Sequence, residues 1–424
     1  MRHNKFNVSM MIMIALLMLS SEIPAETSEV EVRERISTQQ LLEEIDDTSP
    51  VLQELNIQLE AARLERTRAR VILRPTAFYS RENMETGSAS EVEQTFGLSQ
   101  DISFLWQRRT QVRAATADLK ATQLELLDRR AEIGNEIVIG LQRLHQIVQE
   151  MALIDMVSTQ IDFVMKSVKQ RTNLGEISRF EADRFRMEMT KLYSMRQEIA
   201  DNQGQVLEVL IVLTGVSEQQ LRQINVIPAF SVKQLDSDSL VNVALASNRW
   251  IASLREQERA AQEGARLATL LALPSLELEI GSKHVKGGGS GFGFNVGFSF
   301  DMLAERNAVR ELSTASSRSA ASARIAYEKQ LDAKIRRILE QLNLLQSVNR
   351  SRKDDLYLQN ISDARRLYIE GELNATELID VMRAYIDSFR SKNSLTLKEL
   401  ELILELQRLL GIGDNLDEQS QNVD

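Results

Sequence analysis

The sequence predicts a mainly α-helical protein with a small β part, built from two copies of one structural unit. The stretch from Gly175 to Glu181 returns 196 positions later as the stretch from Gly371 to Glu377. Proline, which breaks helices, occurs only five times, and residues 76–227 and 275–424 contain none. A repeated order of long proline-free runs and glycine turns is typical of a duplicated unit, here two long coiled-coil hairpins plus two β-hairpins.

The first 25 residues and the composition limit what the chain can be. Residues 1–25 have basic Arg2 and Lys5, an apolar run and a small residue at Ala25, which together predict a signal peptide and export. The net charge of −10, with both signs well mixed, argues against a nucleic-acid partner, because phosphate binding depends on clustered Lys and Arg. The chain has no cysteine, so packing rather than disulfides must stabilise it, and it offers no acceptor for a lipid anchor.

The first repeat, residues 26–215, is expected to begin with a helix that Pro75 ends. Two runs rich in β-formers follow, with the turn-forming residues 83–88 between them, which is typical of a hairpin. A 4-3-4-3 spacing of apolar residues then indicates a coiled-coil seam. The predicted elements are a hairpin over 76–103, a long helix over 105–172 with a seam of Ile137, Leu141, Leu144, Val148 and Met151, and a return helix over 179–213.

A connector, residues 216–238, leads to the second repeat, residues 239–411, and a C-terminal tail, residues 412–424, follows. Pro274 is expected to end the first helix of this repeat, as Pro75 does in the first. The same elements then recur in the same order. They are a helix from about 240 to 272, a hairpin over 275–300, a long helix over 305–370 with a seam of Leu331, Ile335, Ile338, Leu342 and Leu345, and a return helix over 375–410.

The second hairpin has the clearest alternation of apolar and polar residues. One face of its strands is apolar and the other carries Ser, Glu, Gly and Asn, which suits lipid on one side and water on the other. An ordinary soluble hairpin is the alternative, but helices on the order of 100 Å long leave no compact body for it to cover. Four strands cannot close a membrane barrel, whereas three copies would supply twelve. The apolar face consists of Leu276, Leu278, Ile280, Phe292, Phe294, Val296, Phe298 and Phe300.

This order of elements, with a Gly-Glu-Ile turn at 175–177 and a Gly-Glu-Leu turn at 371–373, resembles the TolC family of outer-membrane efflux proteins. The resemblance covers nearly all of the chain after the signal peptide. It implies a homotrimeric α-barrel that crosses the periplasm, topped by a 12-stranded transmembrane β-barrel in the outer membrane of a Gram-negative bacterium. Such a protein is a passive exit duct of a tripartite efflux or type I secretion system, without cofactor or enzymatic activity. Its partners are outer-membrane lipid, a periplasmic adaptor (a membrane fusion protein) and an inner-membrane transporter of the RND or ABC type.

The resemblance also implies a gate ring just beyond the second turn. In the family, acidic residues six and nine positions after the turn glycine line the narrowest ring, and from Gly371 these are Glu377 and Asp380. Three chains would place six carboxylates at one constriction, which favours cations. The alternative for Glu377 is a capping box with Asn374, in which the acid satisfies backbone N–H groups at a helix start. Capping does not explain Asp380.

A lock between the two helical hairpins is implied for Glu181 and Tyr368. Capping from Ser178 is again the alternative for the acid. The family's usual Arg and Thr near this lock are Leu373 and Phe180 here, so the lock is expected to be weaker or differently built. The turn residues expected to contact the adaptor are Leu174, Gly175, Glu176, Ile177, Glu370, Gly371, Glu372 and Leu373.

Two other classes of protein fit less well. A soluble periplasmic coiled-coil scaffold or adaptor would need glycine-rich β modules around a single helical hairpin, and these are not evident. For an enzyme, no nucleophile and base, phosphate loop or metal cluster stands out, and His145 and His284 belong to no spaced ligand group. The short end after Gly411 resembles the subgroup paired with heavy-metal exporters, although metal ions, drugs and polypeptides all stay open as cargo.

Overall fold

A computed structural model describes residues 48–72, 74–86, 89–176, 178–222, 237–286, 288–299, 303–350 and 357–411. The chain divides into two units, residues 1–34 and 35–424, and all described residues belong to the second unit. Several predictions lie outside the described residues: the signal peptide, residues 223–236 of the connector, the tail 412–424, Ile177 and Phe300.

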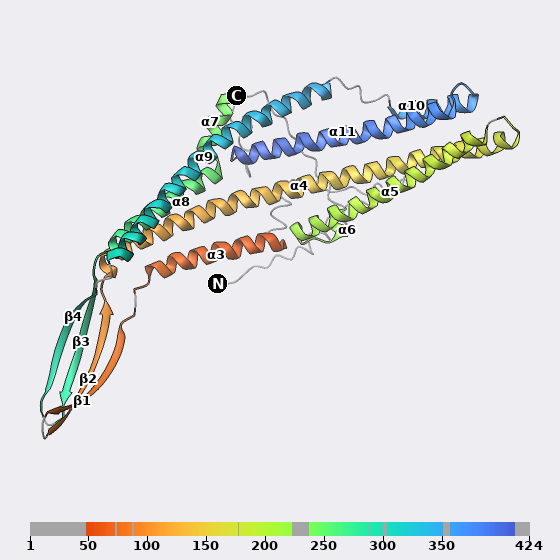
Figure 1. Ribbon diagram of the computed structural model, residues 1–424. Coiled ribbons are helices and arrows are strands. Elements are labelled where there is room, and N and C mark those ends of the chain that lie inside the picture. The colour runs from red at the N-terminus through yellow and green to blue at the C-terminus, as the bar shows by residue number, and fades with distance from the viewer. Residues whose placement is uncertain are drawn as a thin grey trace, which may run out of the picture. The chain divides into compact units, whose positions relative to one another are not determined.

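The described part of the first half begins with helix α3, which starts at Pro50. Ser49 caps its first turn by accepting a hydrogen bond from the N–H of Leu52, and proline suits a first helical position because it needs no N–H partner. After a β-hairpin, helix α4 runs for 70 residues, about 105 Å at ~1.5 Å per residue, and α5 packs back along it (Figure 1). The bounds are α3 Pro50–Arg70, β1 Thr76–Thr86, β2 Ala89–Asp101, α4 Phe104–Asn173, α5 Arg179–Thr214 and α6 Glu218–Leu221.

The second half differs from the prediction at its start, where the single helix expected over 240–272 is two helices. Asn248 leaves the helical conformation, with ψ 122°, and its side chain caps α8 by accepting from the N–H of Ile251 at 2.9 Å. Asparagine is a preferred cap residue, so this break is intrinsic to the sequence. The bounds are α7 Ser237–Ser247, α8 Arg249–Leu271, β3 Ser275–Val285, β4 Ser290–Ser299, α9 Leu303–Arg350, α10 Tyr357–Glu370 and α11 Ala375–Leu409.

A joint ties the end of α5 to the start of α3. The hydroxyls of Thr48 and Ser49 donate to the carbonyl oxygens of Thr214 and Leu213 at 2.9 and 2.5 Å. Gly215 then ends the helix in the left-handed conformation, with φ 70°. A Cβ on this glycine would lie 2.1 Å from the carbonyl oxygen of Thr48, so only glycine fits.

The same joint recurs between α11 and α7–α8 in the second half. The side chains of Ser247 and Asn248 donate to the carbonyl oxygens of Leu410 and Leu409 at 2.6 and 2.9 Å. Gly411 follows with φ 67°, and a Cβ there would lie 2.4 Å from the carbonyl oxygen of Ser247. The duplication read from the sequence is therefore also a duplication of specific hydrogen bonds.

Four strands among the described residues form one antiparallel sheet in the order β1-β2-β3-β4. The register places Leu98 opposite Ile280 and Ile280 opposite Phe294, so the apolar residues of neighbouring strands lie on one face. Large side chains of this face are exposed, Phe292 by 78%. Exposed residues of the face are Tyr79, Phe96, Leu98, Ile280, Phe292, Phe294, Val296 and Phe298.

The opposite face of the sheet is mainly polar, although Phe78 of β1 also lies there, over Gly97. Ser99 hydrogen-bonds to Glu277, and Lys283 forms an ion pair with Glu93, each pair linking β2 to β3. These contacts hold the sheet together on the side where glycines and short polar residues alternate with the charges. The sheet thus separates an apolar surface from a polar one, as the alternation of the second hairpin predicted.

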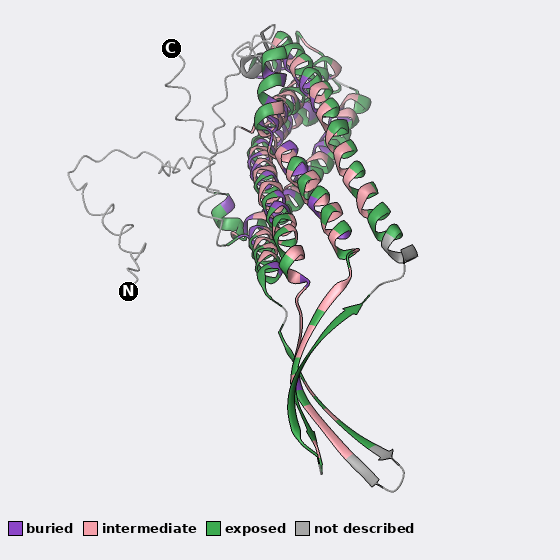
Figure 2. Ribbon diagram, turned by 90° about the vertical axis from the view of Figure 1, so that its left-hand side faces the viewer, coloured by how far each residue is buried: buried purple, intermediate pink, exposed green. Residues whose placement is uncertain are grey.

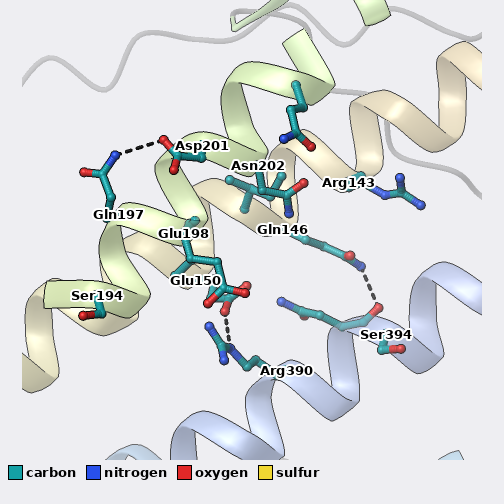
Figure 3. A pocket seen from close by; sticks show the side chains of 14 residues that line it. Arg143, Gln146, Glu150, Ser194, Gln197, Glu198, Asp201, Asn202, Arg390 and Ser394 are labelled. Atoms are coloured by element: carbon teal, nitrogen blue, oxygen red, sulfur yellow. Dashed lines mark hydrogen bonds and ion pairs between the residues drawn. The ribbon is translucent and has the colours of Figure 1, made fainter. Parts of the chain in front are cut away.

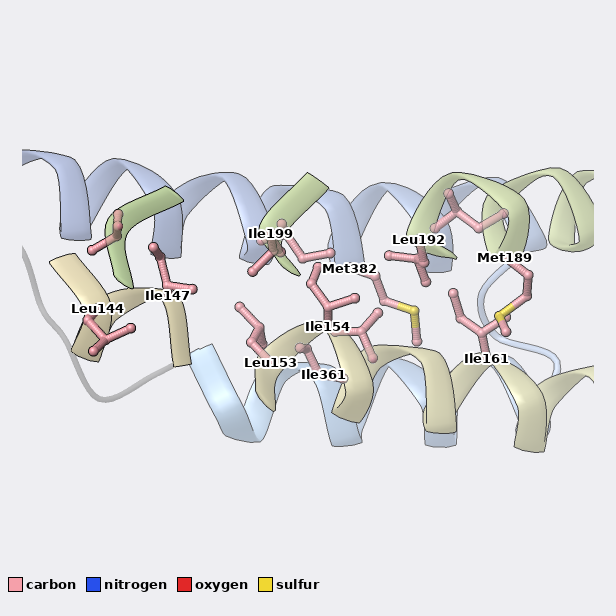
Figure 4. Packing of buried hydrophobic residues seen from close by; sticks show 14 of the residues in the cluster. Leu144, Ile147, Leu153, Ile154, Ile161, Met189, Leu192, Ile199, Ile361 and Met382 are labelled. Carbon is pink, nitrogen blue, oxygen red and sulfur yellow. The ribbon is translucent and has the colours of Figure 1, made fainter. Parts of the chain in front are cut away.

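The main core lies between α4, α5, α10 and α11 (Figure 4), and buried residues concentrate in the helices rather than in the strands (Figure 2). Ile137, Leu141 and Leu144 are buried as the seam predicted, but Val148 is exposed and Ile147 is buried instead. The seam therefore lies one position earlier here than a strict 4-3-4-3 spacing places it. A second core joins α7, α8, α9 and α11, and includes the predicted Leu331, Ile335, Ile338 and Leu342.

Candidate functional site

The two turns between the long helices and their return helices form the candidate site. After α4, Gly175 takes φ 76° and the N–H of Glu176 donates to the carbonyl of Arg171 at 2.9 Å. After α10, Gly371 takes φ 82° and the N–H of Glu372 donates at 2.8 Å to a carbonyl one turn back. Both turns therefore end a helix in the same way, with a left-handed glycine followed by a backbone hydrogen bond.

The predicted contact residues of the turns differ in exposure. Leu174 is 73% exposed. Glu370, the counterpart of Leu174 before the second turn glycine, is also exposed, whereas Leu373 after that glycine packs partly against the main core. Glu176 forms an ion pair with Arg171 at 3.3 Å. The first turn thus presents an apolar side chain to solvent at the position where the second presents a carboxylate. The remaining predicted turn residues, Gly175, Glu370, Gly371 and Glu372, are exposed.

The predicted lock pair, Glu181 and Tyr368, lies close together without a hydrogen bond. Tyr368 is 2% exposed, and its hydroxyl finds no hydrogen-bond partner among the described residues. Burial raises the pKa of this phenol, and the nearby Glu181 carboxylate raises it further. Its ring packs edge to face against Phe185 of α5, with centroids 5.6 Å apart. Within one chain, the contact between the two hairpins at this point is therefore aromatic rather than ionic.

The predicted ring residues lie in the first two turns of α11. Glu377 and Asn374 form a reciprocal capping box, with N–H to oxygen distances of 2.8 and 3.0 Å. The capping alternative is thus present at Glu377, which is nonetheless exposed, as is Asp380 three residues on. Residues three apart share a face of a helix, so the two carboxylates project from α11 in the same general direction. Glu181 has half of such a box, since its N–H donates to the hydroxyl of Ser178 at 3.2 Å.

One ionic contact between the hairpins was not predicted from the sequence. Arg383 of α11 forms an ion pair with the carboxylate of Glu188 on α5. Its Nε lies 3.0 Å from Oε1 and 3.1 Å from Oε2, and its Nη2 also donates to Oε2. The hydrogen bond to Glu188 raises the pKa of Arg383, and the nearby Asp380 adds to this. The sequence offered one indication of this contact: Glu188 is a charged residue within the apolar stripe of Phe185, Met189 and Leu192.

A buried charge cluster lies farther from the turns. Arg408 of α11 bonds to Asp128 of α4 at 2.8 Å and to Glu405 at 3.2 Å, and Glu405 also accepts from Lys334 of α9. Burial raises the pKa of Asp128 despite Arg408. Burial also acts to raise that of Glu405, but Lys334 and Arg408 outweigh it, so this pKa is lowered. The cluster links three helices and touches neither turn.

Within the part of the chain that the structure describes, no three His, Cys, Asp or Glu side chains could hold a metal ion together. His145 contacts Gln149 at 2.9 Å and His284 contacts Ser290 at 2.8 Å. No helix among the described residues is long and apolar enough to cross a membrane. The candidate site therefore consists of the turns, the acidic start of α11 and the contacts between the two hairpins.

Two long helical hairpins, each preceded by a β-hairpin that contributes to one sheet, define the fold of TolC-like outer-membrane channels. The structure is similar to that of a membrane protein from Pseudomonas aeruginosa, with a TM-score of 0.74 and 15% identity over 88% of this chain and 93% of that one. It is also similar to the outer membrane protein VceC of Vibrio cholerae, with a TM-score of 0.71 and 16% identity over 88% and 96% of the two chains.

A third similar structure is the CmeC outer membrane channel of Campylobacter jejuni, with a TM-score of 0.70 and 16% identity over 96% of this chain and 97% of that one. The predicted resemblance is thus confirmed at the level of the fold. No protein-family model matches the chain, and no curated protein sequence matches it.

Proposed function

We propose that this protein is the outer-membrane exit duct of a tripartite efflux or type I secretion system. The observation that carries the proposal is the sheet, which presents a bare apolar face to solvent although the same chain has well-packed helical cores. Exposed apolar patches of this kind mark an interaction surface, and lipid is the partner that suits a whole face of Phe, Leu, Ile and Val. The fold shared with known channels supports the same conclusion.

The barrel is completed by copies of the chain. Strands β1 and β4 are the two edges of the sheet, and long exposed edges pair readily with another chain. In lipid every backbone group must be paired, so the sheet has to close. Three copies joined β1 to β4 give the twelve-stranded barrel and a homotrimer, whereas one copy is below the size of any membrane barrel.

The other end of the duct is the periplasmic tip, where the turns meet a periplasmic adaptor and, through it, an inner-membrane transporter. The exposed Leu174 gives the first turn an apolar contact point for the adaptor. Glu377 and Asp380 of three chains form the acidic ring at the constriction. The duct itself is passive, and energy comes from the transporter.

Conductance of the full-length protein in planar bilayers tests this function. Glu377→Gln/Asp380→Asn removes both charges, and glutamine at the third helical position keeps the capping bond to Asn374. We expect a conducting wild type that prefers cations and a variant with reduced preference but an unchanged thermal unfolding temperature. Asp387→Asn, an exposed acid farther along α11, is the matched control and should keep the preference.

The outcomes separate the parts of the proposal. A soluble protein that gives no conductance would contradict the duct and favour a periplasmic scaffold. A conducting protein whose selectivity ignores both substitutions would keep the duct and refute the acidic ring.

A further inference from the structure

Glu188 is a buried charge that the predicted ring and lock do not use. Glu188 is 4% exposed and lies in the third helical turn of α5, the helix that follows the first glycine turn. Burying an ionised carboxylate is costly unless a partner of opposite charge and hydrogen bonds compensate for the lost water. The position therefore depends on whatever residue neutralises it.

The partner comes from the other repeat. Arg383, 195 residues away in the sequence, approaches with three N–H to oxygen contacts, the forked geometry that makes guanidinium–carboxylate pairs strong. The side chain of Arg383 is 43% exposed, so one half of the pair already faces water. If the hairpins separated, water would take the place of Arg383 at the Glu188 carboxylate.

A neighbouring contact follows the same two helices toward the turns. Arg184 of α5 donates to the hydroxyl of Thr376 on α11. Arg184 and Glu188 are four residues apart, and Thr376 and Arg383 are seven apart, so each pair lies on one side of its helix. These contacts form a short polar seam between the hairpins, beside the point where Tyr368 lacks a hydrogen bond to Glu181.

Beyond the seam, away from the turns, a polar cleft of about 760 Å³ lies between α4, α5 and α11 (Figure 3). Glu198 and Asp201 of α5 line one side and Arg390 of α11 lines the other. Arg390 reaches across to Glu150 of α4 rather than to α5. Arg184 and Glu188 thus link α5 directly to α11 in the seam, whereas Arg390 links α11 to α4 at the cleft.

We propose that Glu188 and Arg383 form the latch that holds the two helical hairpins of one chain together near their turns and keeps the tip of the duct narrow. The proposal rests on the proposed channel function and deepens it. The pair replaces an ionic lock at Glu181 and Tyr368, and opening requires that Arg383 release Glu188 to water.

Single-channel recording of Arg383→Gln in planar bilayers tests the latch. Losing the forked ionic contact should raise the fraction of time in the open state about tenfold. The exchange Glu188→Arg/Arg383→Glu should return it toward the wild-type value, because the pair is restored with reversed charges. Asp183→Asn is the matched control: this exposed acid of α5 pairs with Arg186 on its own helix, so its loss should change nothing.

A distance measurement judges the latch without conductance. The chain has no cysteine, so spin labels at Lys191→Cys on α5 and Ala384→Cys on α11, both exposed, report the separation of the hairpins in detergent-extracted full-length protein. We expect one narrow distance in the otherwise wild-type chain and a longer, broader distribution when Arg383→Gln is added.

The single-channel recording and the label distances together distinguish failure of the proposed function from failure of the latch. A wild type that never conducts would refute the proposed function, and the label distances alone would then decide whether the pair holds the hairpins together. A conducting protein in which Arg383→Gln alters neither open time nor distance would refute the latch and leave the duct intact. An altered distance with unchanged open time would refute its role at the tip.

Discussion

The two repeats agree at their joints and differ at their turns. At each joint, two side chains before a helix donate to the last carbonyls of a return helix, and a left-handed glycine follows. At the turns, the first repeat has an exposed Leu174 and half a capping box, whereas the second has an exposed Glu370 at the corresponding position and a complete box. Backbone requirements preserve the joints, while the turns are free to diverge toward separate tasks.

The largest effect is expected at the joint glycines. Gly215→Ala and Gly411→Ala would each force a Cβ against a carbonyl oxygen in a left-handed conformation, at a cost of about 2–4 kcal/mol. Thermal unfolding followed by circular dichroism in detergent measures this. Gly204→Ala is the control: it lies within α5 with open space around it, and the change should stabilise by about 0.5–1 kcal/mol. Equal behaviour of all three variants would refute the special role of the joints.

The next effect compares the two buried caps of the joints. Ser49→Ala and Asn248→Ala each remove a helix cap and leave a carbonyl of a return helix without its donor, so each should cost about 1–3 kcal/mol. Urea unfolding of the two variants gives the comparison. Similar losses would support one joint used twice, and a loss at only one position would show that the repeats are not energetically equivalent there.

A smaller effect is expected at the caps of the turns. Asn374→Ala breaks a reciprocal box and Ser178→Ala a single bond, so the first should cost about 1 kcal/mol and the second less. Hydrogen exchange of the first turns of α11 and α5 measures the local loss. If the variants exchange alike, the turns do not differ as their hydrogen bonds indicate.

The smallest effect is a pair of pH dependences of opposite sign around Arg408. The lowered pKa of Glu405 gives stability that is present above its unfolded pKa and lost as pH falls through the lower folded pKa. The raised pKa of Asp128 does the reverse: stability falls as pH rises from the unfolded to the folded pKa. The free energy of unfolding is measured against pH, from acid to neutral, for wild type, Glu405→Gln and Asp128→Asn. Each substitution should remove one contribution to the slope of this curve, and the two contributions should have opposite signs. Slopes of the same sign would contradict this assignment.

Local features of the fold could be read from the sequence, whereas contacts between distant elements could not. The glycine turns and the absence of proline indicate the helical hairpins, and period-two alternation indicates the strands of the second hairpin. The break at Asn248 was missed because no proline or glycine marks it in the sequence. The one-position shift from Val148 to Ile147 was missed because a strict heptad does not include the neighbouring helices against which α4 packs.

Contacts at the candidate site could be predicted from the sequence only where the two partners lie close together in the sequence. The box of Asn374 and Glu377 is a spacing of three residues, so the sequence indicates it directly. Glu188 and Arg383 are 195 residues apart, and their pairing depends on how two hairpins pack. The roles of Glu377 and Asp380 in the ring stay predictions, because a ring exists only when copies of the chain assemble.

The number of chains in the native particle tests the central claim most directly, because the sheet is proposed as one third of a closed barrel. Native mass spectrometry of the full-length protein, extracted with detergent from the outer-membrane fraction, gives this number. The account predicts a particle of three chains that salt does not release from the membrane. A single chain that washes into the soluble fraction would contradict it.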